Sequence, residues 1–146
     1  MPAVAETRLV AKALLICDGK MLALKRSATD TRRPLAWDLP GGAVESGEDI
    51  KAACVREVSE ETGITIEVKD CKTVYAMTEY VQPTISATFV FFIAEVHSAT
   101  VVLSNEHIEA QWMSLDEALN AFTYERHSTV LKFVADGDLL HARASC

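Results

Sequence analysis

Basic side chains are in short supply in this sequence. The chain has 14 Lys and Arg residues against 21 Asp and Glu residues, which gives a formal net charge of −7 at pH 7. Proteins bind long nucleic acids largely by neutralising phosphates with Lys and Arg. The composition therefore argues against a long nucleic-acid partner. It is compatible with a nucleotide-sized ligand whose phosphates are shielded by metal.

Long apolar runs are also missing. No segment approaches the roughly 20 apolar residues that a membrane-spanning helix requires. At the N-terminus, Met1-Pro2-Ala3 is not followed by the basic and apolar regions of a secretory signal. We therefore expect a cytoplasmic protein without membrane contact. Its 146 residues are predicted to form a single domain over residues 1–146.

Cysteine and histidine occur without the short spacings of a zinc site. The four cysteines are Cys17, Cys54, Cys71 and Cys146. The four histidines are His97, His107, His127 and His141. Neither set contains a closely spaced pair such as Cys-x-x-Cys, so we expect no structural zinc. The cysteines are predicted to be reduced thiols, three of them buried.

The first half of the chain predicts a hairpin, a loop and a helix. An Asp18-Gly19 pair lies between the apolar runs 8–17 and 21–24, and such a pair favours a tight hairpin turn. Residues 27–36 have the composition of a loop. Residues 48–62 contain no Pro or Gly, and Gly63 stands where a left-handed residue would end a helix. This is the clearest predicted helix.

The second half predicts strands followed by short helices. Two β-rich runs cover residues 64–80 and 83–96, and a third ends at Gln111-Trp112-Met113. Ser114 and Glu117 have the spacing of a capping box for a helix at 115–122, and a last helix is expected at 126–135. Strands and helices mixed in this order predict an α+β fold, or an α/β/α sandwich with a sheet between helices.

Three carboxylates share one face of the predicted helix 48–62. Glu57, Glu60 and Glu61 lie at i, i+3 and i+4, where like charges repel one another. They also occupy the last turn, where the helix dipole disfavours negative charge. Both effects favour a bound cation, although a solvated acidic face explains the spacing equally well.

Position on the helical wheel favours the cation. The side of Glu57 and Glu61 also carries Ile50, Ala53 and Cys54, so the acidic ridge continues the stripe that faces inward. The opposite side is predicted to carry Lys51, Arg56, Ser59 and Thr62. A carboxylate turned toward a core has to be paired or coordinated.

A glycine pair before the helix strengthens the same interpretation. Gly41-Gly42 allows the backbone to approach a ligand closely, and Glu45 and Glu48 add carboxylates near the helix start. Oxygen ligands of this kind suit Mg²⁺, with Mn²⁺ as the alternative. Taken alone, the glycine pair is equally consistent with a tight turn.

Together these residues resemble the motif of the Nudix hydrolases. Gly42, five residues, Glu48, seven residues and then Arg56-Glu57-Val58-Ser59-Glu60-Glu61-Thr62-Gly63-Ile64 match the complete Nudix box over 23 residues. The resemblance implies a Nudix fold and Mg²⁺-dependent hydrolysis of a nucleoside diphosphate linked to another group. Within that family the chain resembles the MutT-like type.

The resemblance also implies roles for individual residues. Metal would be held by Glu57, Glu60, Glu61 and the Gly42 carbonyl, with one more carboxylate from a later loop. Glu106 is the preferred candidate for that carboxylate and Glu109 is the alternative. Arg56 would orient Glu57, and Glu48 would support the site. The proton of the attacking water would be taken by Glu57 or Glu106.

Substrate contacts are expected outside this motif. Arg26 is the main candidate to reach a phosphate or base, with Arg32 and Arg33 as alternatives, and Gly41 allows close approach. Segments 31–36 and 79–83 are predicted edges of the pocket. Several aromatic side chains are candidates to stack on a base, although most are expected in the core: Tyr75, Tyr80, Phe89, Phe91 and Phe92.

The sequence leaves the substrate open. A nucleoside triphosphate is preferred, with ADP-ribose, a nucleotide sugar or a dinucleoside polyphosphate as alternatives. A Nudix-like nucleotide-binding domain without turnover is a second class, but such domains usually lack carboxylates of the motif. An isopentenyl diphosphate isomerase would need a longer chain. The partner is expected to be a small nucleotide, and a homodimer is left open.

Overall fold

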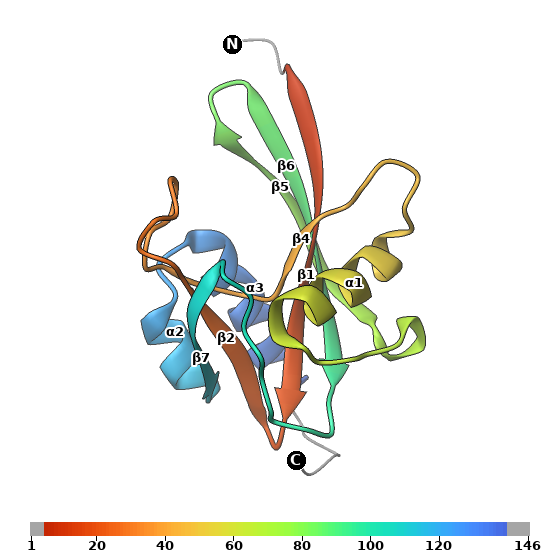
Figure 1. Ribbon diagram of the computed structural model, residues 1–146, viewed down its shortest axis with the longest axis vertical. Helices are drawn as coiled ribbons and strands as arrows, with labels where there is room; N and C mark the ends of the chain where they lie inside the picture. The colour runs from red at the N-terminus through yellow and green to blue at the C-terminus, as the bar shows by residue number, and fades with distance from the viewer. Residues whose placement is uncertain (1–4, 140–146) are drawn as a thin grey trace.

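The computed structural model describes residues 5–139. Figure 1 shows the order of the strands and helices along the chain. The elements are β1 (Glu6–Cys17), β2 (Lys20–Arg26), β3 (Trp37–Asp38), β4 (Gly41–Ala43), α1 (Ile50–Thr62), the 3-10 helix η1 (Val68–Asp70), β5 (Lys72–Gln82), β6 (Ile85–Glu95), β7 (His107–Met113), α2 (Leu115–Ala121) and α3 (Glu125–Asp136).

The strands form one mixed sheet. Five strands lie in the order β3-β2-β1-β6-β5, while β4 pairs with β1 and β7 pairs with β2. Strands β1 and β6 are parallel, and the other pairs are antiparallel. Strand β1 is central, so its side chains reach both faces of the sheet.

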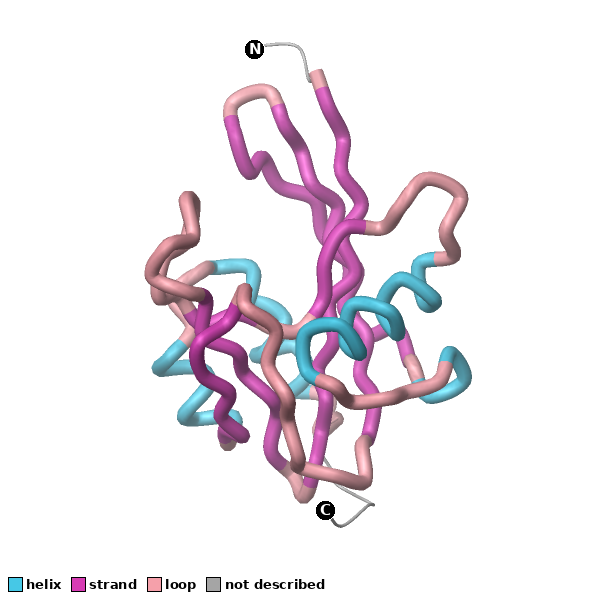
Figure 2. Tube along the Cα trace, in the orientation of Figure 1, coloured by secondary structure: helices cyan, strands magenta, loops and turns pink. Residues whose placement is uncertain are grey.

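Helices cover both faces (Figures 1 and 2). On one face, Cys54 and Val58 of α1 pack in a core with Ala13 and Leu15 of β1. On the other, α2 and α3 pack on the alternate residues of β1, including Leu14 and Ile16. The predicted α/β/α sandwich is confirmed, because a strand's successive side chains point to opposite faces and both faces are apolar here.

Local signals placed the turn and the main helix correctly. Asp18 and Gly19 have φ of 54° and 77°, as a tight hairpin turn requires. Helix α1 begins two residues later than the predicted 48–62, because the Asp49 side chain caps it by accepting from the Lys51 and Ala52 backbone N–H groups. It ends at Gly63, which has φ 72°. The capping box at Ser114 is present.

Two predictions about local structure were wrong. Residues 64–71 do not continue a strand: Ile64 and Ile66 pack into the core below α1, η1 follows, and β5 begins at Lys72. Thr62 is buried rather than facing solvent, since its hydroxyl donates to the Val58 carbonyl and accepts from the Ile64 N–H.

One of the cysteines is not the reduced thiol that the sequence predicted. Cys17, Cys54 and Cys71 are buried, as predicted. Cys54 and Cys71 are free. Cys17 is disulfide-bonded, which corrects the prediction for this residue. Cys146 lies outside the described residues.

Among residues 5–139, none of the helices is both long and apolar enough to span a membrane. The cytoplasmic location stays a prediction from the sequence.

Candidate active site

The glycine pair brings backbone against two carboxylates of α1. The Gly41 N–H donates a 2.7 Å hydrogen bond to Glu61 Oε1. A Cβ on Gly41, whose φ is +139°, would lie 2.1 Å from the Ala11 carbonyl oxygen. A Cβ on Gly42 would lie 2.7 Å from the Glu57 carboxyl carbon. Gly41 therefore packs against the backbone of β1 and Gly42 against the Glu57 side chain of α1, and neither position leaves room for a Cβ.

Burial favours the neutral form of these two carboxyl groups when no cation is bound. Glu61 is only 5 % exposed, and this burial raises its pKa to about 7. Glu57 is half-buried, and its burial raises its pKa in spite of the neighbouring Arg56 guanidinium. A buried carboxylate is stable in its charged form only when it is paired or coordinated. The pair is suited to a divalent metal.

Arg56 holds the acidic ridge in place. Its Nε lies 2.8 Å from Glu48 Oε2, and its Nη1 lies 3.1 Å from Glu57 Oε1 and 3.4 Å from Glu60. Its Nη2 donates to the Ala43 carbonyl. Arg56 lowers the pKa of Glu48 to about 2. The Arg56 guanidinium thus contacts both Glu48 and Glu57.

Glu60 and Glu106 lie at opposite margins of the cluster. The Glu60 side chain is 57 % exposed and touches Arg56, and it does not line the adjoining cavity. Glu106 does line the cavity. A carboxylate oxygen of Glu106 lies within 4.8 Å of a carboxylate oxygen of Glu61 and a ring nitrogen of His107. Glu109 is exposed and does not line the cavity, so the geometry favours Glu106 over Glu109.

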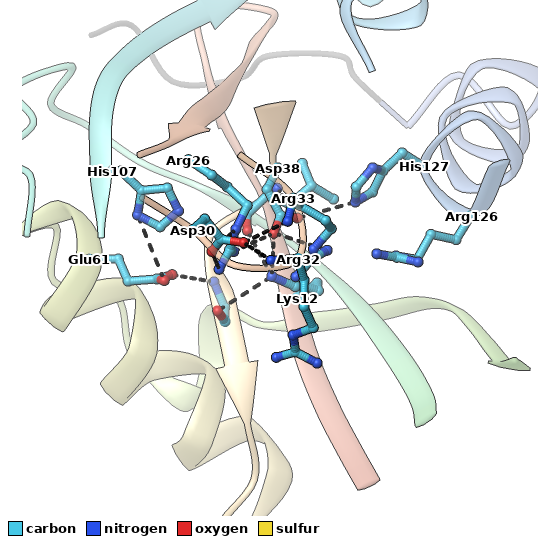
Figure 3. A network of polar contacts seen from close by, with 12 residues as sticks. Lys12, Arg26, Asp30, Arg32, Arg33, Asp38, Glu61, His107, Arg126 and His127 are labelled. Atoms are coloured by element: carbon cyan, nitrogen blue, oxygen red, sulfur yellow. Dashed lines mark hydrogen bonds and ion pairs between the residues drawn. The ribbon is translucent and has the colours of Figure 1, made fainter. Parts of the chain in front are cut away.

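His107 is a member of the cluster that the sequence did not reveal. Its ring is buried, and Nδ1 lies 4.0 Å from Glu61 Oε2 (Figure 3). Within residues 5–139, neither ring nitrogen has a hydrogen-bond partner. Burial lowers the pKa of His107, which favours the neutral ring. Its position next to Glu106 in sequence was the one available signal.

A cavity of about 750 Å³ opens beside these carboxylates. Glu57, Glu61, Glu106 and the glycine pair form one part of its wall. Basic side chains form much of the rest: Arg8, Lys12, Arg26, Arg32, Arg33 and Arg126. Predicted edges 31–36 and 79–83 both contribute, through Arg32 and Arg33 and through Glu79–Gln82.

Asp38 gathers the basic side chains of this wall (Figure 3). It is 1 % exposed, and its Oδ2 lies 3.2 Å from Lys12 Nζ, 3.1 Å from Arg26 Nη1 and 3.5 Å from Arg33 Nη1. His127 Nε2 lies 3.2 Å from its Oδ1. Burial alone would raise the pKa of Asp38, but Lys12, His127 and Arg33 outweigh it and hold this pKa well below its usual value.

Lys12 connects this group to the glycine turn. Its Nζ donates to the carbonyls of Leu39 and Gly41, both at distances that fit hydrogen bonds. Sequence reasoning missed Lys12, Asp38 and His127, because each lies in a different element and only the fold brings them together.

Arg26, the main candidate for substrate contact, lies in the cavity wall but is already engaged. It binds Asp30 through Nε and Nη2 and Asp38 through Nη1. Its hydrogen bonds hold the pKa of Asp30 well below the usual range. The Arg32 backbone N–H donates to Asp30 Oδ1, but among residues 5–139 its guanidinium forms no ion pair, and its side chain is exposed at the cavity.

Arg126 of α3 forms another part of the wall that the sequence did not suggest. It is 7 % exposed and pairs with Glu79 of β5. Its guanidinium also lies over the rings of Phe89 and Tyr124, each at 4.8 Å from the ring centroid. These contacts fix a cation at the part of the cavity next to segment 79–83.

The aromatic candidates divide between core and cavity. Phe91 and Phe92 are fully buried in the two cores, and Tyr75 packs against Phe133. Phe89 and Tyr80 line the cavity, and Tyr80 is 51 % exposed. Of these two, Tyr80 is exposed at the cavity, whereas Phe89 is buried with the Arg126 guanidinium over its ring.

In this α/β/α sandwich, the carboxylate cluster of α1 adjoins a cavity lined by basic side chains. This arrangement is typical of a protein that binds an anionic ligand together with a cation. The NUDIX domain family model matches residues 7–133, and the chain belongs to the Nudix family. It is a hydrolase of pyrophosphate bonds that acts on nucleoside diphosphate derivatives. Hydrolases of this family generally use a divalent metal.

Comparison with known proteins identifies relatives with different names. The chain is similar to the MutT-like protein of Streptomyces ambofaciens, with 31% identity over 87% of this chain and 75% of that protein. It is similar to the ADP-ribose pyrophosphatase of Methanocaldococcus jannaschii, with 32% identity over 86% and 70%. The crystal structure of the MutT protein from Methanosarcina mazei Go1 matches with a TM-score of 0.79 and 29% identity, over 90% of this chain and 96% of that one.

Proposed function

We propose that the protein is a nucleoside triphosphate pyrophosphohydrolase of the MutT-like type that uses Mg²⁺ or Mn²⁺. The observation that carries this proposal is the cavity, in which the carboxylates of α1 meet a wall of basic side chains. A triphosphate carries more negative charge than ADP-ribose, so it gains more from such a wall. Similarity to two proteins with MutT in their names supports the same choice.

The residues present fit a divalent metal. The Cβ missing from Gly42 leaves room for the Glu57 carboxylate, and the ring nitrogens of His107 are buried without partners among residues 5–139. We assign Glu57, Glu60, Glu61, Glu106 and the Gly42 carbonyl to hold the metal. When bound, a divalent metal neutralises phosphate charge and lowers the pKa of water.

The chain's own groups carry out the remaining tasks. Arg56 orients Glu57, because it binds Glu48 and Glu57 at the same time. Glu57 or Glu106 accepts the proton of the attacking water, since both line the cavity. Arg32 and Arg26 bind the phosphates, Arg32 through its exposed guanidinium and Arg26 from a position fixed by Asp30 and Asp38. Tyr80, which is exposed at the cavity, supplies surface for a base.

A second candidate is the hydrolysis of ADP-ribose or a nucleotide sugar. The relative named ADP-ribose pyrophosphatase, at 32% identity, favours it. A nucleotide-binding domain without turnover is disfavoured, since every carboxylate of the Nudix motif is present in this chain.

A panel of nucleotides, incubated with Mg²⁺ or Mn²⁺ in ¹⁸O-labelled water, tests the proposal. We expect nucleoside monophosphate and pyrophosphate from a triphosphate, at a higher kcat/KM than for ADP-ribose. The position of the ¹⁸O identifies the phosphorus that is attacked. Release of AMP and ribose 5-phosphate from ADP-ribose, with no turnover of triphosphates, would support the second candidate instead.

A further inference from the structure

The histidine beside the acidic cluster has no partner that explains its burial. His107 is 4 % exposed, and neither ring nitrogen has a hydrogen-bond partner among residues 5–139. Buried polar atoms are nearly always paired, so an unpaired one needs an explanation. Figure 3 shows the ring turned toward Glu61, away from the group around Asp38.

A register shift in β7 turns this side chain toward α1. Ala110 and Trp112 pack on the face covered by α1, so strict alternation would place Ile108 on that face and His107 on the other. The pairing with β2 moves from Lys25–Glu109 to Arg26–His107, which skips Ile108. Ile108 is instead 56 % exposed, and His107 faces Glu61. Irregularities of this kind re-aim side chains next to active sites.

The distances fit a shared ion better than a direct contact. Nδ1 of His107 lies 4.0 Å from Glu61 Oε2, which is too far for a hydrogen bond. Two ligands that each lie about 2.1 Å from one ion are separated by at most about 4.2 Å. The third donor, on the exposed Glu106 side chain, lies within 4.8 Å of the others.

We propose that His107 is a nitrogen ligand of the metal centre, together with Glu61 and Glu106, and that it makes the centre prefer a divalent transition metal such as Mn²⁺ to Mg²⁺. Imidazole binds transition metals well, whereas Mg²⁺ takes oxygen ligands. The inference rests on the metal centre of the proposed function and adds one ligand and a metal preference to it.

Pulsed electron paramagnetic resonance of the Mn²⁺-loaded protein tests the ligand directly. We expect a Mn²⁺ signal with ¹⁴N coupling from a bound imidazole in the wild type, and none in His107→Gln. The matched control is His127→Gln, because His127 is also buried but lies against Asp38. That variant should keep the coupling. Competition binding should show the Mn²⁺:Mg²⁺ affinity ratio falling by about tenfold or more in His107→Gln alone.

The possible outcomes separate this inference from the proposed function. If Mn²⁺ binds without ¹⁴N coupling, or if coupling survives in His107→Gln, His107 is not a ligand and the carboxylate centre still stands. If Mn²⁺ does not bind at all, both proposals fail. If His107→Gln does not fold, selective ¹⁵N labelling of histidine and single replacement of His97, His127 and His141 decide by elimination, since coupling should survive all three.

Discussion

At the scale of single residues, the site depends on glycine at position 42. A Cβ there would overlap the Glu57 carboxyl group at 2.7 Å, and this side chain cannot retreat without leaving Arg56. We expect Gly42→Ala to lower kcat/KM by about 100-fold, because displacing a catalytic group by about 1 Å has effects of this size. Gly19→Asn is the control, since nothing lies within 4 Å of a Cβ at Gly19. Equal activity of both variants would contradict the geometry.

The carboxylates themselves give a second test. We expect Glu57→Gln and Glu60→Gln each to lower kcat at saturating Mg²⁺ by about 100-fold or more, as loss of a metal ligand or proton acceptor should. Glu109→Gln is the matched control, because Glu109 is exposed and lies away from the cavity. Near wild-type turnover in both Glu57→Gln and Glu60→Gln would mean that the metal assignment is wrong.

Much of the site could be predicted from residues close together in sequence. Glu57 and Glu61 lie at i and i+4 on one helix, so their spacing placed them on one face before any fold was known. The helical wheel put Arg56 on the opposite side, yet in the structure its guanidinium reaches Glu57. His107 could not be found in this way, because an alternating strand would turn it from Glu61 and only the register shift brings it back. Asp38 was missed because its partners lie on four other segments.

At the scale of elements, the cap of α1 sets where the acidic helix begins. The Asp49 carboxylate accepts from the Lys51 and Ala52 N–H groups at 3.0 and 3.1 Å. We expect Asp49→Ala to lower the free energy of unfolding by about 1 kcal/mol, measured by urea denaturation, while Asp49→Ser retains most of it. Equal losses in both variants would show that the side-chain cap does not stabilise the helix.

At the same scale, the packing of residues 64–68 explains why the strand predicted there does not form. Residues 64–68 alternate apolar and polar side chains, which is typical of a strand. Ile64 and Ile66 use that alternation to enter the core below α1, while no neighbouring strand pairs with them among the described residues. Periodicity reports which side chains are buried, and pairing depends on neighbours that the sequence does not identify.

At the scale of the whole molecule, Asp38 and His127 join α3 to the sheet and to the cavity wall. Burial lowers the pKa of His127 in spite of Asp38. Below about pH 6.5, His127 is therefore protonated more in the unfolded chain than in the folded one. The pKa of Asp38 is also depressed, which acts in the same direction below about pH 4. Both contributions to stability are present at neutral pH and decrease as the pH falls.

Denaturant unfolding between pH 5 and 8 tests this linkage. We expect the free energy of unfolding of the wild type, minus that of His127→Gln, to decrease as the pH falls below about 6.5. Taking the difference cancels the contributions of other titrating groups to the pH dependence. One of these is Glu61, whose raised pKa acts in the opposite direction. A difference that is constant over this range would show that His127 titrates alike in both states.

The central claim is that the carboxylates of α1 hold metal at the mouth of a basic cavity, where a pyrophosphate bond is cleaved. Anomalous diffraction from a crystal soaked in Mn²⁺ tests it most directly. We expect anomalous density between Glu57, Glu61 and Glu106, within reach of the Gly42 carbonyl. Absence of density there, with these side chains pointing into solvent, would contradict the claim.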